Sequence, residues 1–187
     1  MTQLIHWFST NYPHLKQALL ETNHNFDNSE TNPHHIEGDC WSHTMMVCKI
    51  AQLKGYSRVV QVSALLHDIG KPQSRKINLE NNHVQFFGHE EISAVMAKPL
   101  VKDLVEREMI TSSESEEILK LIALHAYLYK HNKEEIYKKF KDELEFFKHL
   151  VELGICDDLG RFSERMGKSS LDIDAIMAKI EEESINL

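Results

Sequence analysis

The sequence predicts an all-α protein, a compact bundle of about seven or eight helices. Apolar residues recur with the 3.6-residue period of a helix along most of the chain, whereas no alternating strand pattern persists for long. The chain has 187 residues, a length that suits one domain with a sizeable core. We therefore expect residues 1–187 to form a single domain.

The N-terminal part is expected to be helical and then to continue as a loop. Residues 2–21 should form one or two short amphipathic helices, interrupted near Pro13. Residues 22–39 are rich in Asn, Asp, Ser, Pro and Gly, and this composition predicts a loop. Its adjacent histidines, His34 and His35, are expected to be solvated.

The loop leads into two helices with well-marked ends. Apolar residues follow His43 at positions i+4, i+7 and i+8, so His43 should open the inward face of the first helix, which ends at Gly55. Ser57 is expected to cap the second helix, at residues 58–69. Pro72 prevents this helix from continuing.

The second half of the chain continues in the same helical pattern. The expected elements are, in order, a polar turn at residues 78–82, a helix starting near His89, a helix behind a capping box at Ser113 and Glu116, a long helix at about residues 133–154 and a final helix at about residues 171–183. Pro99 is expected to kink or divide the helix that starts near His89.

Composition limits the cellular compartment and the classes of partner that we expect for this protein. The net charge of −8 argues against a general nucleic-acid binder, which would show a basic surface, but leaves room for a small anionic ligand. Three cysteines without CxxC spacing indicate reduced thiols. The N-terminus does not resemble a signal peptide, and no apolar run is long enough to span a membrane. We therefore expect a cytoplasmic protein without a membrane partner.

The pair His67-Asp68 is the most informative stretch. The chain contains 12 histidines, and this one, with the aspartate beside it, ends an apolar helical run just before Gly70, Lys71 and Pro72. Both side chains carry lone pairs that must be satisfied once they leave water. A divalent metal would satisfy both, whereas packing alone explains an adjacent pair poorly.

Other candidate ligands lie at helix ends or on inward faces. They are His43, His89, His125, Asp157 and Asp158. Nitrogen and carboxylate ligands together suit Mn, Fe, Co, Ni or Zn, whereas Mg prefers all-oxygen sites. Each candidate also has a structural alternative. A lone buried histidine is more often a core residue than a ligand, His125 fits either role equally, and an aspartate at a helix end such as Asp158 is commonly a cap.

Four motifs in order carry a family resemblance. They read EGDCWSHTMM (residues 37–46), HDIGKP (67–72), FGHE (87–90) and DDLGR (157–161). Their histidines and aspartates resemble the H…HD…D signature of the HD-domain metal-dependent phosphohydrolases. The whole set resembles the HD domain attached to bacterial tRNA nucleotidyltransferases, over about residues 36–161. The resemblance implies an HD-domain helical bundle with N- and C-terminal helical extensions.

The resemblance assigns roles to residues at matching positions. The four core metal ligands implied are His43, His67, Asp68 and Asp157. Asp157 is preferred to Asp158 because glycine and arginine follow it at the family's spacing. His89 and His125 resemble the additional histidines that hold a second metal or contact phosphate. The implied cofactor is one or two divalent ions (Mn, Fe, Ni, Co, Zn or Mg).

Four charged residues receive further roles through the resemblance. Asp68 and Lys71 would be catalytic, Lys71 and Arg161 would contact the substrate phosphate, and Glu90 would orient a ligand histidine. On spacing alone, Lys71, Arg161 and Glu90 are ordinary surface charges. Two departures stand out: Ser93 replaces a common glycine, and the residues before the match contain no nucleotidyltransferase motif. We therefore expect no CCA addition by this chain.

The expected reaction is hydrolysis of a phosphomonoester or phosphodiester by a metal-activated water. The expected substrate is a small phosphorylated molecule such as a nucleotide, with a nucleic-acid end as a further possibility. A competing hypothesis is a non-catalytic module, either nucleotide-sensing or metal-stabilised, that acts through a partner. A third is a purely structural helical protein that binds no metal.

Overall fold

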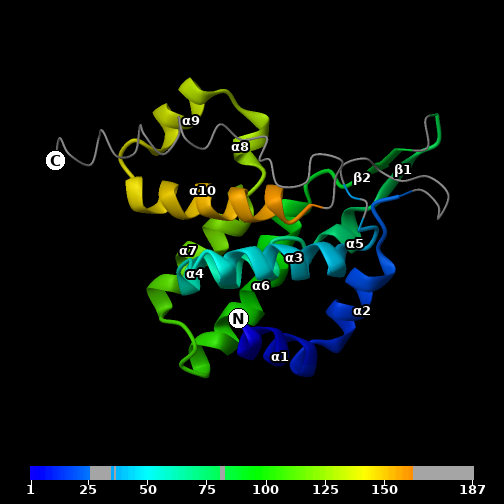
Figure 1. The fold of residues 1–187 in the computed structure, drawn as a ribbon, viewed down its shortest axis with the longest axis horizontal. Helices are drawn as coiled ribbons and strands as arrows, with labels where there is room; N and C mark the ends of the chain where they lie inside the picture. Colours follow the sequence, from blue (N-terminus) through cyan, green and yellow to red (C-terminus); the bar gives the residue numbers. More distant parts are fainter. Residues whose placement is uncertain (26–34, 36, 81–82, 162–187) are drawn as a thin grey trace.

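The computed structural model describes residues 1–25, 35, 37–80 and 83–161 (Figure 1). Within these ranges the helices are α1 (Thr2–Asn11), α2 (Pro13–Glu21), α3 (Cys40–Leu53), α4 (Arg58–Leu66), α5 (Lys71–Ser74), α6 (His89–Glu106), α7 (Ser112–Leu124), α8 (Tyr127–Lys130), α9 (Lys133–Phe140) and α10 (Leu144–Leu159). The strands are β1 (Lys76–Asn78) and β2 (His83–Gln85). The predicted all-α bundle is confirmed.

The signals expected at Pro13, Gly55 and Ser57 are confirmed, a cap at Asp39 was not foreseen, and α4 ends at Leu66 instead of the expected residue 69. Pro13 occupies the first turn of α2, so the N-terminal helical region is interrupted there. The Asp39 side chain accepts a hydrogen bond from the amide of Ser42 and caps α3. Ser57 caps α4 in the same way, and Gly55 adopts a left-handed φ of +68° just after α3.

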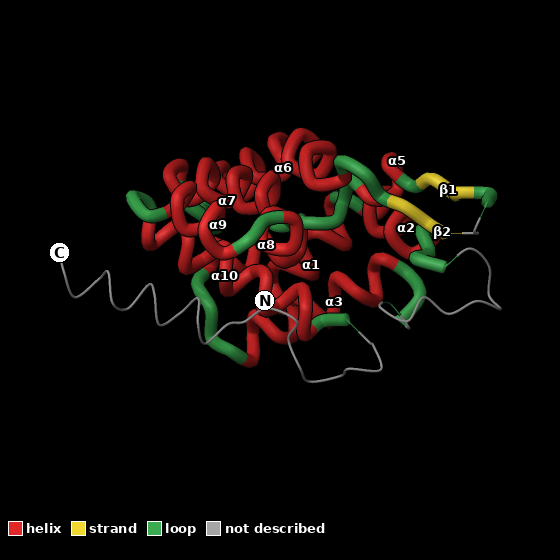
Figure 2. Tube along the Cα trace, turned by 90° about the horizontal axis from the view of Figure 1, so that it is seen from above, coloured by secondary structure: helices red, strands yellow, loops and turns green. Residues whose placement is uncertain are grey.

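The core forms where α3, α4, α7 and α10 contact one another, with α6 packed along α7 (Figure 1). Its largest fully buried side chains include Leu65, Leu66, Leu121, Ile122 and Leu150. The short hairpin of β1 and β2 projects at one end of the helices (Figure 2). That end also carries α5, so the residues that follow α4 lie between the helical core and the hairpin.

The hairpin was not expected from the sequence. Its strands pair antiparallel, with Ile77 opposite Val84. Each strand has three residues, which is too few for a period-two pattern to stand out. The polar turn was expected at residues 78–82; Leu79 and Glu80 form a turn after β1, and residues 81 and 82 lie outside the described ranges.

Of the two expectations for Pro99, a kink or a division of the helix, the division was wrong. Helix α6 passes through this residue without being divided. A proline removes the hydrogen bond to the carbonyl four residues earlier. That carbonyl belongs to Val95, whose side chain is 62% exposed, so water can satisfy it on this face of the helix.

The expected helix at residues 133–154 is instead two helices, α9 and α10. The rings of Phe140 and Phe147 stack with their centroids 5.5 Å apart. In one straight helix these two residues would be about 10 Å apart along the axis, so the stacking requires α9 to fold back. The apolar period is similar on both sides of the break and therefore hides it.

Two other expectations concern helix ends. The capping box ahead of α7 uses Thr111 and Glu114, so the expected box at Ser113 and Glu116 was shifted by two residues. The helix expected at residues 171–183 lies outside the described residues. Among the helices that are described, none combines the length and the apolar character needed to cross a bilayer.

Candidate metal centre

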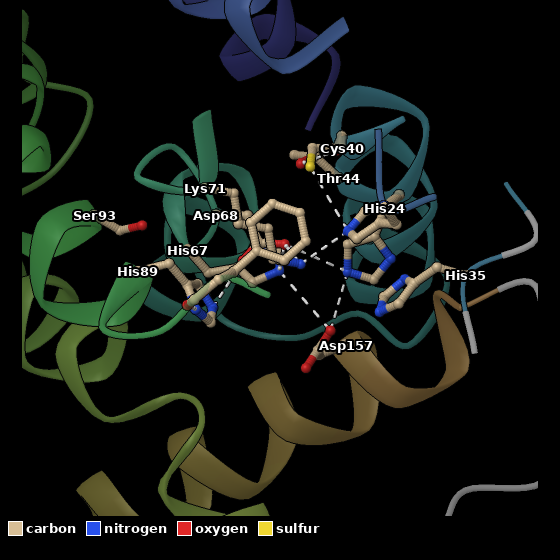
Figure 3. A network of polar contacts seen from close by, with 12 residues as sticks. His24, His35, Cys40, Thr44, His67, Asp68, Lys71, His89, Ser93 and Asp157 are labelled. Carbon is tan, nitrogen blue, oxygen red and sulfur yellow. Dashed lines mark hydrogen bonds and ion pairs between the residues drawn. The ribbon is translucent and has the colours of Figure 1, made fainter. Parts of the chain in front are cut away.

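A first group of possible ligands is formed by His43, His67 and Asp157. They come from the first turn of α3, the end of α4 and the last turn of α10. The Nε2 atom of His43 lies 3.0 Å from Asp157 Oδ1, and the Nε2 atom of His67 lies 3.9 Å from the same oxygen. Figure 3 shows Asp157 extending from α10 toward His67.

A second group is formed by Asp68, His89 and His125. Asp68 Oδ1 lies 3.3 Å from His89 Nε2 and 3.8 Å from His125 Nε2. The two imidazole Nε2 atoms are 3.0 Å apart. Helix α6 begins with His89, and His125 directly follows α7, so the close packing of these helices joins the two rings.

Asp68 lies between the two groups and offers one oxygen to each. Its Oδ2 atom is 3.2 Å from His67 Nε2 and 3.7 Å from His43 Nε2. Its Oδ1 atom faces the second group. A carboxylate in this position has the geometry to bridge two ions, and six of the residues predicted as ligands are thus brought together.

Backbone carbonyls fix the orientation of three histidines. The Nδ1 atoms of His67, His89 and His125 lie 2.7–2.9 Å from the carbonyl oxygens of Ala64, Phe86 and Ile122. A carbonyl only accepts, so each Nδ1 carries the proton and each Nε2 keeps its lone pair. His43 Nδ1 faces a carboxylate instead, 3.1 Å from Glu37 Oε1. All four Nε2 atoms therefore point into the centre as electron-pair donors.

This donor set fits a divalent cation. Lone pairs of His89 and His125 face each other, and His67 Nε2 and Asp68 Oδ1 are buried without a hydrogen-bond partner. Such groups are costly to bury unless a cation or a donor compensates them. Mixed imidazole and carboxylate ligands match the transition metals and zinc predicted from the sequence.

The electrostatics keep three of the candidate ligands, Asp68, Asp157 and His125, in their metal-binding forms. Burial opposes ionisation of Asp68, but His67 and Lys71 hold the pKa of its carboxyl well below its usual range. Burial likewise opposes ionisation of Asp157, and Arg161 and His43 hold its pKa well below the usual range. Burial, reinforced by His67 and His89, lowers the pKa of His125 to about 3. Charged carboxylates and neutral imidazoles are the protonation states that bind metals.

The distal aspartate nearest the histidines is Asp157. Its oxygens contact His43 and Arg161, whereas Asp158 belongs to neither ligand group. Both residues lie inside the last turn of α10, not after it as the sequence suggested. Adjacent helical residues point about 100° apart, so only one of the two can face the histidines.

The three charged residues singled out in the sequence lie around the centre. Lys71 is buried, and its Nζ atom is 2.7 Å from Asp68 Oδ2. Arg161 Nη2 is 3.0 Å from Asp157 Oδ2. Glu90 Oε2 is 3.2 Å from His89 Nδ1, and its other oxygen pairs with Lys130. None is an ordinary surface charge.

A third cluster was missed by the sequence interpretation. It consists of His24, His35 and Glu37. The rings of His24 and His35 stack at 4.0 Å, and His35 Nδ1 lies 2.8 Å from Glu37 Oε1, so the expectation that His35 is solvated was wrong. His34 lies outside the described residues. No periodicity marks a histidine inside a polar loop, and only the fold brings this segment to the centre.

A pocket of about 440 Å³ opens over the centre. Its floor includes Asp68, His89, His125 and Asp157, and the side chains of Lys71 and Arg161 line it. Residues of the hairpin end form one wall, and α8 contributes Tyr129 and Lys130 to another. Four of the six candidate metal ligands therefore line a pocket that a small molecule can enter.

Comparison with known proteins agrees with this geometry. The model of the family described as HD domain matches residues 40–174, a range that contains both ligand groups. The chain belongs to the HD domain family. HD domains bind divalent metals and are typically metal-dependent phosphohydrolases.

Relatives with a related segment are much longer proteins. The chain is 36% identical over 90 residues to the Multifunctional CCA protein of Methylobacillus flagellatus, covering 48% of this chain and 21% of that protein. It is 39% identical over 71 residues to the Multifunctional CCA protein of Burkholderia cenocepacia, covering 38% of this chain and 16% of that protein. The matched segment is therefore a small part of each relative.

Proposed function

We propose that this HD domain is a metal-dependent phosphohydrolase that cleaves a phosphomonoester or phosphodiester of a nucleotide or of an RNA end. The observation that carries the proposal is the position of Asp68, with one oxygen facing each of two ligand groups. An isolated structural metal requires one closed ligand set. Two adjoining sets beneath an open pocket favour a centre that acts on a bound molecule.

Each ligand group would hold one ion. His43, His67 and Asp157 would bind the first, His89 and His125 the second, and Asp68 would be shared. A divalent ion at such a centre supplies the activation of a water nucleophile and neutralises phosphate charge. The proposal accommodates Mn, Fe, Co, Ni, Zn or Mg, although the histidines favour the transition metals and zinc.

Two cations of the chain would act on the phosphate group. Lys71 and Arg161 line the pocket and stay charged, because Asp68 and Asp157 raise the pKa of their respective partners. For Lys71, this carboxylate overcomes a burial effect that acts in the opposite direction. Donors fixed in advance at the place where negative charge develops stabilise a transition state.

The pocket supports a small substrate. Its volume of about 440 Å³ lies within the range of small-molecule sites, and its floor carries the candidate metal ligands. A mononucleotide or the end of an RNA strand suits this size, while the net charge of −8 disfavours broad contact with a nucleic acid. The resemblance of the four motifs to the HD domain of tRNA nucleotidyltransferases makes an RNA end the second substrate to test.

The experiment combines metal analysis with an activity screen. Purified protein is loaded with Mn, Co, Ni, Zn or Mg and assayed on nitrophenyl phosphates, a nucleotide panel and short RNAs with terminal phosphates. We expect metal-dependent release of phosphate or nucleotide, which Asp68→Ala abolishes and Asp158→Asn preserves. Unchanged turnover in Asp68→Ala would reject the mechanism, and nucleotide binding without turnover would favour the non-catalytic alternative.

A further inference from the structure

His24 reaches the metal centre from the segment between α2 and α3. Its side chain is buried, and its Nδ1 atom lies 3.0 Å from the carbonyl oxygen of Gly38. The backbone amide of His24 donates to the same oxygen at 2.8 Å. Since a carbonyl only accepts, Nδ1 carries the proton and Nε2 is left as an acceptor.

The acceptor atom of His24 faces Lys71. Lys71 Nζ lies 3.1 Å from His24 Nε2 and 2.7 Å from Asp68 Oδ2. Burial, with help from the Lys71 ammonium, lowers the pKa of His24 far below its usual value. The result is a neutral acceptor beside a charged donor, which makes a charge-assisted hydrogen bond.

Arg75 fixes the backbone on both sides of His24. Its Nε atom donates to the carbonyl oxygen of Asn23 and its Nη2 atom to that of Asn25, each at 3.0 Å. Lys71 and Arg75 are four residues apart, so one short stretch of chain hydrogen-bonds both to the side chain of His24 and to the backbone on either side of it. The ring therefore has a defined position relative to Asp68.

We propose that His24 is a positioning residue that holds Lys71 ready to bind the phosphate of the substrate. An ammonium group has three N–H donors. Asp68 and His24 each accept one, and the third is left for an oxygen in the pocket that Lys71 lines. This inference rests on the proposed function, because it assigns Lys71 a phosphate in that pocket.

Without His24, the ammonium group of Lys71 would lose one of the two acceptors that fix its orientation. Its side chain is a flexible four-carbon stem, and Asp68 would remain as the charged partner in contact with it. The ammonium could then turn toward both carboxylate oxygens and away from the pocket. His24 thus acts through Lys71 and has no need to touch the substrate.

A metal held by His24, His35 and Glu37 is the alternative use of this cluster. The rings of His24 and His35 are nearly parallel, with an angle of 5° between them, so their in-plane lone pairs do not converge on one point. The Lys71 ammonium beside His24 Nε2 would also repel a cation. Both observations favour a role for His24 in holding the lysine.

A double-mutant cycle tests the proposal. The affinity of the Mn-loaded protein for inorganic phosphate is measured by calorimetry for the wild type, His24→Leu, Lys71→Met and the double variant. We expect Lys71→Met to weaken phosphate binding by about tenfold, the scale of one hydrogen bond to a charged group. We expect His24→Leu to weaken it by about three- to tenfold, and the double variant to bind like Lys71→Met alone.

Two further variants separate positioning from folding. His24→Gln retains an acceptor and should recover most of the lost affinity, and His14→Leu, at an exposed histidine, should match the wild type. Metal content and the helical circular dichroism signal are measured for every protein. The proposal would be overturned by any of three results. These are additive losses of phosphate affinity in the double variant, wild-type affinity in His24→Leu, and equal loss of bound metal in His24→Leu and His24→Gln.

The phosphate measurement does not depend on turnover. If none of the proteins hydrolyses a substrate while the cycle remains non-additive, the proposed hydrolase function fails and the role of His24 in phosphate binding stands. If hydrolysis is normal while the losses add, only the role of His24 fails. Absence of phosphate binding by the Mn-loaded wild type would overturn the positioning role directly.

Discussion

The two ligand groups on either side of Asp68 differ in how they are built. His43 and His67 are completely buried at their side chains, and the first group is braced by the charged side chains of Glu37 and Arg161. In the second group His125 is also buried, but the His89 side chain is 15% exposed and lines the pocket. The first group is thus suited to retain an ion, and the second to an ion that meets the substrate.

Removing the shared carboxylate should have the largest effect. Asp68→Ala takes one oxygen from each group and leaves Lys71 without its ion pair. We expect turnover to fall by about a thousandfold or more, because metal-assisted catalysis is worth several kcal/mol and each 1.4 kcal/mol is tenfold in rate. Turnover of the metal-loaded variant is compared with that of Asp158→Asn. A loss of less than tenfold would mean that Asp68 is not shared.

The two groups should respond differently when one histidine is removed from each. We expect His43→Ala to lose the tightly held ion and His125→Ala to retain it, while both lose most of their turnover. The measurement is metal content by plasma mass spectrometry after dialysis. Equal metal retention in the two variants would show that the groups do not differ in the way their surroundings suggest.

Substitution of Glu37, whose carboxylate contacts His43, should have a smaller effect than loss of a candidate ligand. Glu37 Oε1 lies 3.1 Å from His43 Nδ1. We expect Glu37→Gln to weaken binding of the first ion by about ten- to a hundredfold, the usual cost of losing a partner that orients a ligand histidine. Competition with a fluorescent chelator gives the affinity. An unchanged affinity would show that the carboxylate does not orient the histidine.

The smallest effect is expected from substitution of Ser93, a residue of α6 that is hydrogen-bonded to the stretch after Asp68. Its Oγ accepts a hydrogen bond from the amide of Gly70 at 2.9 Å, so it links the stretch after Asp68 to α6. We expect Ser93→Ala to lower the free energy of unfolding by about 1–3 kcal/mol, because a buried amide loses its partner. Chemical denaturation measures it, and retention of the first ion serves as the control. Unchanged stability would show that this link contributes nothing.

Most helices and the candidate ligands that lie together could be predicted from the sequence because each has a local signal. Caps and apolar periods mark α3 and α4, and the pair His67-Asp68 stands out against the apolar run before it. The break between α9 and α10 could not be predicted, because the stacking of Phe140 on Phe147 that requires it is a tertiary contact. An apolar period alone does not show where a helix folds back.

The cluster around His24 was beyond prediction for a similar reason. Nothing in a polar loop distinguishes a buried histidine from a solvated one. An isolated antiparallel β-bridge pairs Asn23 with Asp39, and Arg75 hydrogen-bonds to the backbone of Asn23. These contacts between residues far apart in sequence bring the segment to the centre. Ser93 is comparable, since its departure from the family pattern acquires a reason only when its hydroxyl is seen beside Gly70.

Anomalous diffraction from crystals of the Mn-loaded protein is the most direct test of whether Asp68 is shared between two ions. We expect one anomalous peak bounded by His43, His67 and Asp157 and a second bounded by His89 and His125, with one Asp68 oxygen directed at each. A single peak that excludes Asp68, or peaks only at other residues, would contradict this expectation.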